Sequence, residues 1–347
     1  MPALSRTWRG AVPAIALGIT LLSAGQAFAD DTIGGNTQNP VDPDASGDSD
    51  GNGSISATAG VVFERSHNGK GAAVGPLAPA GNWSPPPCWF APKYTPAQFQ
   101  AYVEPIWEAG STGPEWDAAQ RDRYVNGHPY KDFNKAKTGK GYWWDSYVDD
   151  SRAGDPGFLA CSFKPIFWVD TGTPPPADVP EAITPEILSQ LAYAEIRVPD
   201  TEVTLAPKAT TKVNLQTWAW LDRADFKPVS VTASVPVLDI QATTTATPVS
   251  LTLEPGTADA ELFPASGNCP IVNGHIGTPY RHGDADKTPP CGLTYLRASG
   301  DNGPYKLRAT ITWEISWTSN AAPGGDLPDG TFGTTQDVTV EEIQALN

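Results

Sequence analysis

The feature that most limits the fold is a strict alternation of apolar and polar residues in YKLRATITWEISW, at 305–317. Apolar side chains recur at every second position, and residues such as Lys306 and Glu314 fall between them. Successive side chains of a β-strand point to opposite faces, so this segment predicts a long antiparallel strand with one buried and one solvated face. We expect Trp313 and Trp317 on the buried face.

The same period of two runs through most of the chain after Pro199. The segments VSVTASV at 229–235 and VSLTL at 249–253 also alternate, and turns containing Gly and Pro separate such segments. Many short strands with these turns and little helix are typical of a β-sandwich. The expected fold class is therefore mainly β, with an antiparallel β-sandwich at residues 179–347, led by a short helix after Thr184.

Residues 82–178 have a different character and are rich in Pro, Gly and aromatic residues. Thr95 and Gln98 match a capping box, and apolar residues then recur on one helical face as far as Gly110. A second short helix is expected at 114–126. The rest of this region predicts loops, so we expect a small aromatic-rich module of helices and loops.

The N-terminus has the pattern of a secretory signal. Arg6 and Arg9 precede an apolar run at 11–22, and the small residues of AFA at 27–29 end the pattern. We expect residues 1–29 to be removed, leaving a secreted or cell-surface chain without a membrane anchor. The formal net charge of the whole chain is −16, which disfavours binding to nucleic acid or anionic lipid.

The chain has four cysteines: Cys88, Cys161, Cys269 and Cys291. An even number in an exported chain predicts two disulfides, for which three pairings exist. The proline-rich segment at 171–182 predicts a stiff, extended hinge between the first two cysteines and the last two. A bridge across this hinge would tie together modules that its stiffness holds apart. We therefore expect Cys88–Cys161, which would staple the aromatic-rich module, and Cys269–Cys291.

Residues 30–81 are dominated by Gly, Pro, Asp, Ser and Asn and predict a disordered linker with at most one short strand, at 61–63. Within them, GDSDGNGSI at 47–55 fits both a G-x-S-x-G nucleophile elbow and the start of a calcium loop. A nucleophile elbow needs a strand before Ser49 and a helix after it, and the residues on either side of Ser49 favour neither. A calcium loop starting at Asp48 needs a Glu at its last position, where this chain has Ala59. We interpret the segment as a spacer.

Several sequence blocks occur here in an order found in one group of proteins. PEILSQLAYAEIRVP is followed by ATPVSLTLEPGTADAEL, GTPY, CGLTYLRAS, YKLRATITWEISWTS and VTVEEIQALN. Over residues 180–347 the chain resembles uncharacterised actinobacterial secreted proteins that carry a C-terminal PKD-like β-sandwich. The resemblance implies an Ig-like sandwich and an extracellular location, and it implies no reaction. The W-x-F-G-D-G turn of PKD-like domains is absent, because LEPG at 253–256 takes its place.

The strongest candidate binding segment is GKGYWWDSYVDD at 139–150. It places aromatic side chains next to a carboxylate: Tyr142, Trp143, Trp144, Asp145 and Tyr147. On a sugar-binding platform such aromatic faces stack on pyranose rings and the carboxylate accepts from hydroxyls. Two alternatives remain open, because the aromatic residues could form the core of the module and paired carboxylates could hydrolyse a glycosidic bond.

The chain has no zinc-type spacing and no phosphate-binding loop. His275, His282, Asp284 and Asp286 lie in one polar loop, but their spacing matches no ligand pattern, so we expect no metal and no cofactor. The expected function is non-catalytic: a secreted or cell-surface binding or assembly protein for an unknown protein or a cell-surface glycan. The alternatives are a carbohydrate-binding protein that uses the segment 142–147 and a glycoside hydrolase.

Overall fold

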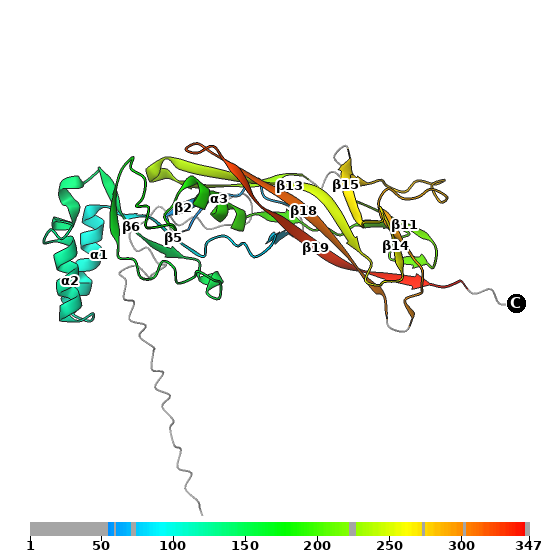
Figure 1. The fold of residues 1–347 in the computed structure, drawn as a ribbon, viewed down its shortest axis with the longest axis horizontal. Coiled ribbons are helices and arrows are strands. Elements are labelled where there is room, and N and C mark those ends of the chain that lie inside the picture. The colour runs from blue at the N-terminus through cyan, green and yellow to red at the C-terminus, as the bar shows by residue number, and fades with distance from the viewer. Residues whose placement is uncertain are drawn as a thin grey trace, which may run out of the picture.

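The computed structural model describes residues 55–58, 60–70, 74–221, 227–272, 275–300 and 303–343. The expected signal sequence, residues 1–29, lies outside these ranges, as does the spacer segment at 47–55 except for its last residue, Ile55. The described residues form an elongated molecule, with two helices at one end, short strands at the other end and long strands between them (Figure 1). The prediction of a mainly-β chain is confirmed, since most of the regular structure is antiparallel strand.

Three long antiparallel strands form the middle of the molecule: β13 (Ile240–Glu254), β18 (Tyr305–Ser319) and β19 (Gly325–Glu341). β18 lies between the other two strands. Its alternation is as predicted, with Trp313 buried and Lys306 and Glu314 exposed. Trp317 is only half-buried, contrary to expectation, because its neighbour on β19 is Gly325, which has no side chain to cover it.

Among the described residues, these strands belong to one 14-stranded sheet. β12 (Val229–Val235) pairs with the first half of β13, and β15 (Asn268–Val272) pairs with its second half. The sheet continues through these strands: β16 (His275–Gly277), β11 (Gln216–Leu221), β17 (Gly292–Tyr295) and β14 (Ala260–Phe263). β9 (Thr204–Ala206) pairs with β11, and β10 (Thr210–Lys212) pairs in parallel with β19. The antiparallel sheets expected after Pro199 are therefore present and are joined through β13.

The segment at 30–81 differs from the predicted linker. Its described residues contain four strands: β1 (Ile55–Thr58), β2 (Val61–Glu64), β3 (Val74–Pro76) and β4 (Ala78–Pro79). β2 pairs with β12 and buries Val61 and Phe63, while β4 pairs with β19. The linker prediction is wrong for these residues, because the partners that order them lie far along the chain. The short strand predicted at 61–63 is confirmed.

The aromatic-rich module contains a sheet that the sequence did not predict. Three antiparallel strands form it: β5 (Cys88–Tyr94), β6 (Gly141–Val148) and β7 (Phe167–Asp170). The two predicted helices are confirmed as α1 (Pro96–Ala109) and α2 (Pro114–Tyr124). The capping box of α1 is complete, since the Gln98 N–H donates to Thr95 Oγ1 and the Thr95 N–H donates to Gln98 Oε1. The module therefore combines helices with strands rather than with loops alone.

Both predicted disulfides are confirmed. Cys88 bonds to Cys161 with a Cα–Cα distance of 6.1 Å, and Cys269 bonds to Cys291 with a distance of 5.5 Å. The first bridge lies within the aromatic-rich module, and the second lies within the large sheet. No free cysteine occurs among the described residues.

The proline-rich segment at 171–182 does not hold two modules apart. The Phe90 N–H donates to the carbonyl of Glu181, and the Ile183 N–H donates to the carbonyl of Phe90. Val179, Ala182 and Ile183 are buried in one hydrophobic core that continues from β5–β7 into the large sheet. The prediction of a separating hinge is therefore wrong, because the end of this segment pairs with β5.

Helix α3 (Pro185–Ala194) follows directly, starts at the predicted Thr184 cap and packs against β12 and β13. The short strand β8 (Arg197–Pro199) comes next and pairs with β3. Through these contacts the linker strands, the helix and the large sheet meet close to the aromatic-rich module.

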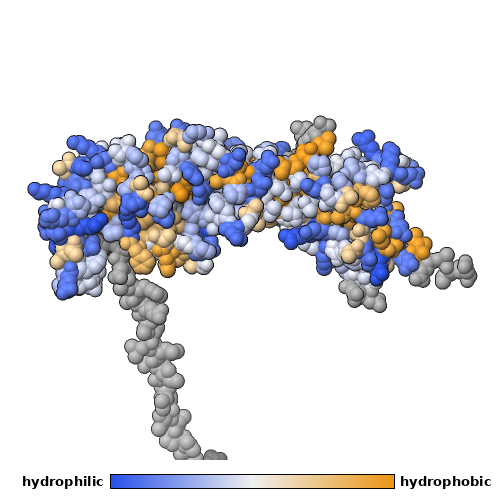
Figure 2. Space-filling model, viewed as in Figure 1, coloured by the Kyte–Doolittle hydropathy of each residue, from blue (hydrophilic) through white to orange (hydrophobic). Residues whose placement is uncertain are grey.

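The visible surface is mostly hydrophilic, with apolar residues in separate patches along its length (Figure 2). In the described part of the chain, none of the helices has the length and apolar character needed to cross a bilayer.

Candidate functional site

The aromatic residues predicted as a sugar-binding platform lie on β6, and most of them are buried. The exposed fractions of Trp143, Trp144 and Tyr147 are 0%, 2% and 5%, and only Tyr142 is half-buried. Stacking on a pyranose ring requires an accessible aromatic face, and these rings have none. The platform prediction is therefore wrong, and the alternative interpretation of these rings as core is confirmed.

Trp143 is the centre of a second hydrophobic core beneath α1 and α2. Its ring centroid lies 4.6 Å from that of Phe99 and 5.4 Å from that of Tyr124. Its indole Nε1–H donates to the carbonyl of Phe133 at 3.0 Å. Phe133 has a φ of 54°, and its neighbours Asp132 and Asn134 also have positive φ, a conformation that costs energy in non-glycine residues. Burial of the Phe133 ring and the bond from Trp143 hold this turn in place.

Asp145 forms a buried ion pair rather than a ligand contact. Lys93 Nζ lies 3.0 Å from Asp145 Oδ2, and both side chains are almost completely buried. The ammonium also lies 4.8 Å from the centroid of the Tyr147 ring. The other carboxylate oxygen of Asp145 accepts from the Ser146 N–H at 2.8 Å. Because these contacts occupy the carboxylate, Asp145 is not available to a sugar or to a glycosidic bond.

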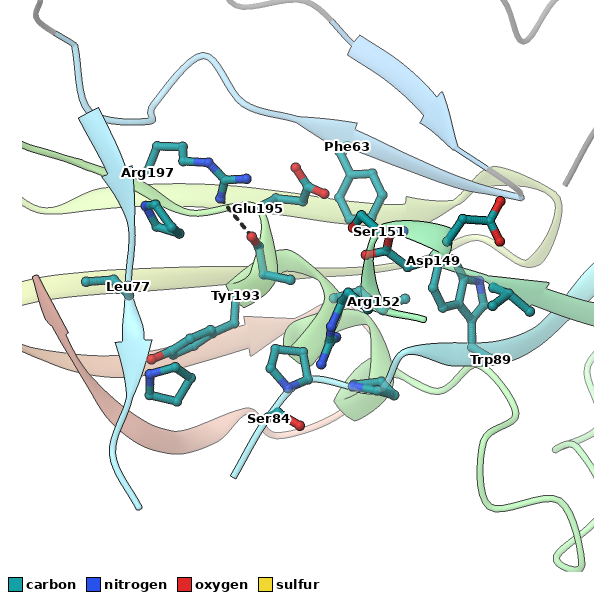
Figure 3. Close-up of a pocket in the computed structure, with 18 residues that line it drawn as sticks. Phe63, Leu77, Ser84, Trp89, Asp149, Ser151, Arg152, Tyr193, Glu195 and Arg197 are labelled. Carbon is teal, nitrogen blue, oxygen red and sulfur yellow. Dashed lines mark hydrogen bonds between the residues drawn. The ribbon is translucent and has the colours of Figure 1, made fainter. Parts of the chain in front are cut away.

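A cavity of about 750 Å³ lies nearby, where the aromatic-rich module meets the large sheet. We call it the junction cavity, and Figure 3 shows its lining. One wall comes from the segment before β5, from the start of β5 and from the end of β6 with the short turn η2 (Asp150–Arg152). The other comes from β2, from the region of β3 and β4, and from the end of α3 with β8. The lining residues are Phe63, Pro76, Leu77, Pro79, Ser84, Pro85, Pro86, Trp89, Val148, Asp149, Asp150, Ser151, Arg152, Leu191, Tyr193, Ala194, Glu195 and Arg197.

The walls of the junction cavity are largely apolar and stiff. Four prolines, three aromatic rings and several aliphatic side chains contribute to them. Tyr193 packs edge-on against Trp83, with 5.1 Å between centroids, and Trp89 stacks on Tyr147 at 6.3 Å. At Gly330 on β19, an added Cβ would lie 2.6 Å from the Tyr193 hydroxyl and 2.9 Å from Leu77 Cβ. The missing side chain at this position leaves the space that the Tyr193 hydroxyl and Leu77 occupy.

Two buried polar groups on these walls have no hydrogen-bond partner among the described residues. They are the indole Nε1 of Trp89 and the hydroxyl of Tyr193, and the two residues are only 4% and 2% exposed. Burial raises the pKa of Tyr193 well above its usual range, and the nearby charge of Asp329 adds to the shift. The hydroxyl therefore stays protonated and able to donate. An unsatisfied buried donor is costly. Both atoms have almost no accessible surface, so they lie within the packing of the walls and not on the open space of the cavity.

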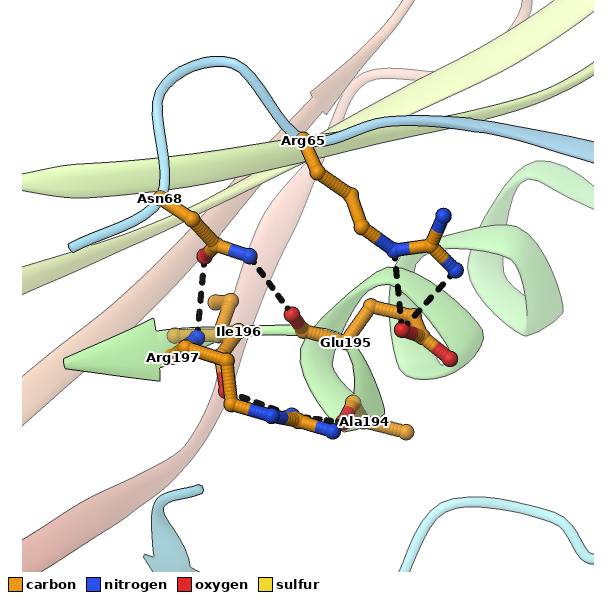
Figure 4. A network of polar contacts seen from close by, with 6 residues as sticks. All are labelled: Arg65, Asn68, Ala194, Glu195, Ile196 and Arg197. Carbon is orange, nitrogen blue, oxygen red and sulfur yellow. Dashed lines mark hydrogen bonds and ion pairs between the residues drawn. The ribbon is translucent and has the colours of Figure 1, made fainter. Parts of the chain in front are cut away.

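On one wall of the cavity, the charged groups Glu195 and Arg197 are held by other residues. Glu195 Oε2 accepts from Arg65 at 2.9–3.0 Å, and Asn68 bridges the carbonyl of Glu195 to the N–H of Arg197 (Figure 4). The Arg197 guanidinium donates to the carbonyls of Ala194 and Ile196. This network ties the loop after β2 to the connection between α3 and β8, so this wall is fixed by polar contacts.

The opposite wall is fixed in a similar way. Asp149 Oδ1 accepts from both the N–H and the hydroxyl of Ser151, which closes the turn η2. Arg152 forms an ion pair with Asp155 at 2.7 Å. The Cys88–Cys161 bridge joins the start of β5 to the loop that follows η2. The junction cavity is thus a preformed site between two braced walls, which suits binding.

Sequence reasoning did not find the junction cavity. Its lining comes from six short stretches between Phe63 and Arg197, and no motif joins them. Trp89 and the prolines before it were visible only as part of the aromatic-rich region. The residues before β5 were expected to form loops, and those of β2–β4 were assigned to a linker. Neither assignment pointed to a shared site.

The polar loop with the candidate metal ligands shows no metal centre. Asp284 accepts from Lys287 Nζ at 2.8 Å and from the N–H of Arg281 at 3.0 Å, and these bonds lower its pKa. Among the residues that the structure describes, no group of three or more His, Cys, Asp or Glu side chains is placed to hold a metal ion.

Comparisons with family models, with curated proteins and with solved structures found no match to this chain.

Proposed function

We propose that this chain is a non-catalytic extracellular or cell-surface binding protein whose ligand occupies the junction cavity. The observation that carries the proposal is a largely apolar cavity whose two walls are held in place by polar contacts and by the Cys88–Cys161 disulfide. Its volume of about 750 Å³ lies within the range of roughly 300–1,000 Å³ that is usual for ligand sites. Such sites often form where two parts of a protein meet.

The composition of the lining supports binding rather than chemistry. No lysine, histidine or cysteine is among the described lining residues. Glu195 is engaged by Arg65, and Asp149 is engaged by Ser151. A glycosidase needs two free carboxylates that face each other across the substrate, whereas Glu195, which lies on the wall opposite Asp149 and Asp150, is paired with Arg65. Engaged carboxylates hold the walls in place and are poorly suited to accept and donate protons.

Two features support the extracellular location. Both disulfides are formed, and disulfides persist mainly in oxidising compartments. The signal pattern at 1–29 independently predicts that the chain is exported. We further propose that residues 180–347 are related to the PKD-like sandwiches that the sequence resembles, because the mainly antiparallel sheet built around β13, β18 and β19 is compatible with such a relationship.

Binding can be tested by sedimentation with the envelope fraction of the cells that secrete the protein. Ser84 is an exposed lining residue at the edge of the junction cavity, so Ser84→Trp should obstruct the entrance without disturbing the core. Ser111 is an exposed serine that does not line the cavity, and Ser111→Trp is the matched control. We expect the wild-type protein and Ser111→Trp to sediment with the envelopes and Ser84→Trp to stay in solution.

Equal sedimentation of the two variants would show that the cavity is not the binding site.

The secreted protein should also begin close to Asp30 when its N-terminus is sequenced. A full-length chain retained in the cytoplasm would contradict the proposed location.

A further inference from the structure

The two walls of the junction cavity carry opposite charges that no ion pair within the described part of the chain neutralises. On the wall with η2, Asp149 Oδ1 accepts from the N–H and the hydroxyl of Ser151, which are neutral donors, and Asp150 is exposed. On the wall with α3 and β8, the half-buried Arg197 guanidinium donates through Nη1 to two backbone carbonyls, which are neutral acceptors. These hydrogen bonds orient Asp149 and Arg197 without cancelling their charges.

The remaining charged groups of the lining are paired. Glu195 is paired with Arg65 at 2.9 Å, and Arg152 is paired with Asp155 at 2.7 Å. The wall with η2 is therefore left with negative charge and the wall with β8 with positive charge. A charge that the protein already holds in position attracts a ligand group of opposite sign without first having to be ordered.

Proline rings supply apolar surface that a ligand in the cavity can reach. Pro76 is exposed, and Pro79 and Pro86 are half-buried. Figure 3 shows Arg197 and Asp149 on opposite sides of the cavity, so a ligand that meets both charges must extend across it. The matching ligand therefore has a cationic group at one end, an anionic group at the other end and an apolar part between them.

We infer that the junction cavity binds a short peptide that carries a free amine and a free carboxylate. This inference rests on the proposed function and names the ligand class for the same site. The peptide carboxylate accepts from Arg197, whose guanidinium has further N–H donors at Nε and Nη2 and suits a carboxylate. The peptide ammonium lies beside Asp150, and apolar side chains contact the proline rings. A neutral glycan carries neither charge and is a poor match for these walls.

The test titrates the tripeptide Ala-Pro-Ala, with both termini free, into the secreted, disulfide-bonded protein. The backbone amide signals of Ser151 and Arg197 in a ¹⁵N–¹H spectrum report on the two walls and give the Kd. We expect both signals to move. The N-acetylated peptide lacks the ammonium and the C-amidated peptide lacks the carboxylate, so each should bind about threefold more weakly than the free peptide, as for the loss of one accessible ion pair. A chitin oligosaccharide controls for the ligand class and should move neither signal.

Variants assign each end of the peptide to its wall. Asp150→Asn should weaken the free peptide about threefold and leave the N-acetylated peptide unaffected, because that peptide has no ammonium for Asp150 to attract. Asp286→Asn is the matched control, since Asp286 is exposed and does not line the cavity, and it should bind every peptide as the wild-type protein does. Arg197→Gln keeps an N–H donor for the backbone carbonyls but loses the charge, so it should weaken the free peptide and not the C-amidated one. If Arg197→Gln does not fold, the C-amidated peptide still tests this wall in the wild-type protein.

The outcomes distinguish this inference from the proposed function. If the three peptides bind equally, if none of them moves the two signals, or if Asp150→Asn weakens the free and N-acetylated peptides alike, the inference is overturned. If the oligosaccharide moves the signals and the peptides do not, the cavity binds a ligand but the peptide class is wrong. The proposed function fails separately, when Ser84→Trp and Ser111→Trp sediment equally with the envelopes.

Discussion

At the scale of single residues, the ion pair of Lys93 and Asp145 shows how a residue that suits a binding site can serve the core instead. Two charges removed from water are tolerated only when each meets the other in good geometry, and here 3.0 Å separates Nζ from Oδ2. The sequence shows an Asp among aromatic residues but does not show that a lysine from β5 reaches it. The bulge of β5 between Pro92 and Tyr94 opposite β6 is part of this local arrangement.

Loss of the Asp145 charge should be strongly destabilising. Asp145→Asn leaves the Lys93 ammonium buried without its counter-charge, and we expect the free energy of unfolding to fall by about 3–5 kcal/mol. Urea denaturation followed by fluorescence measures this change. The double variant Asp145→Asn with Lys93→Met removes both charges and should recover most of the loss. A cost below about 1 kcal/mol for the single variant would indicate a solvated pair.

At the scale of elements, the long strand β18 behaves as its alternation predicts. Trp313 fills the inner face, and Glu314, the next residue, points to solvent. We expect Trp313→Ala to lower the free energy of unfolding by about 3–5 kcal/mol, because it empties a large buried volume. Glu314→Ala should change it by less than about 0.5 kcal/mol. Equal costs, measured by denaturant unfolding, would contradict the assigned faces.

At the scale of the whole molecule, the aromatic-rich module and the large sheet should unfold together. Phe90 links the module to the segment that leads into α3, because its backbone pairs with residues 181–183, and its ring packs within the module on Phe167, 5.6 Å away. Phe90→Ala should therefore cost about 3–5 kcal/mol and lower the unfolding midpoint of both parts by the same amount. Phe163→Ala is the matched control, since this side chain is 77% exposed, and it should change stability by less than about 0.5 kcal/mol.

Coincident transitions of the two parts can be followed by amide hydrogen exchange at α1 and at β18. Separate transitions would indicate that the segment at 171–182 acts as a hinge after all. They would also place the junction cavity between independently moving parts rather than between fixed walls.

Local rules were sufficient for several features. The alternation at 305–317, the capping box at Thr95 and the two disulfide pairings were predictable, because each depends on residues that are close in sequence or on a small number of alternatives. The strands of residues 55–79 were not predictable by the same rules. Their composition is that of a linker, and only pairing with β12 and β19 stabilises them.

The sequence by itself thus determined the period of the strands, the ends of the helices and the cysteine pairs, because a repeating pattern or a cap acts over a few residues. Only the tertiary structure decided which aromatic residues are buried and where a ligand could bind. Burial depends on what packs against a side chain, and the neighbours of Trp143 and Trp89 come from distant parts of the chain. The junction cavity exists only where these parts meet, so no single stretch of sequence contains it.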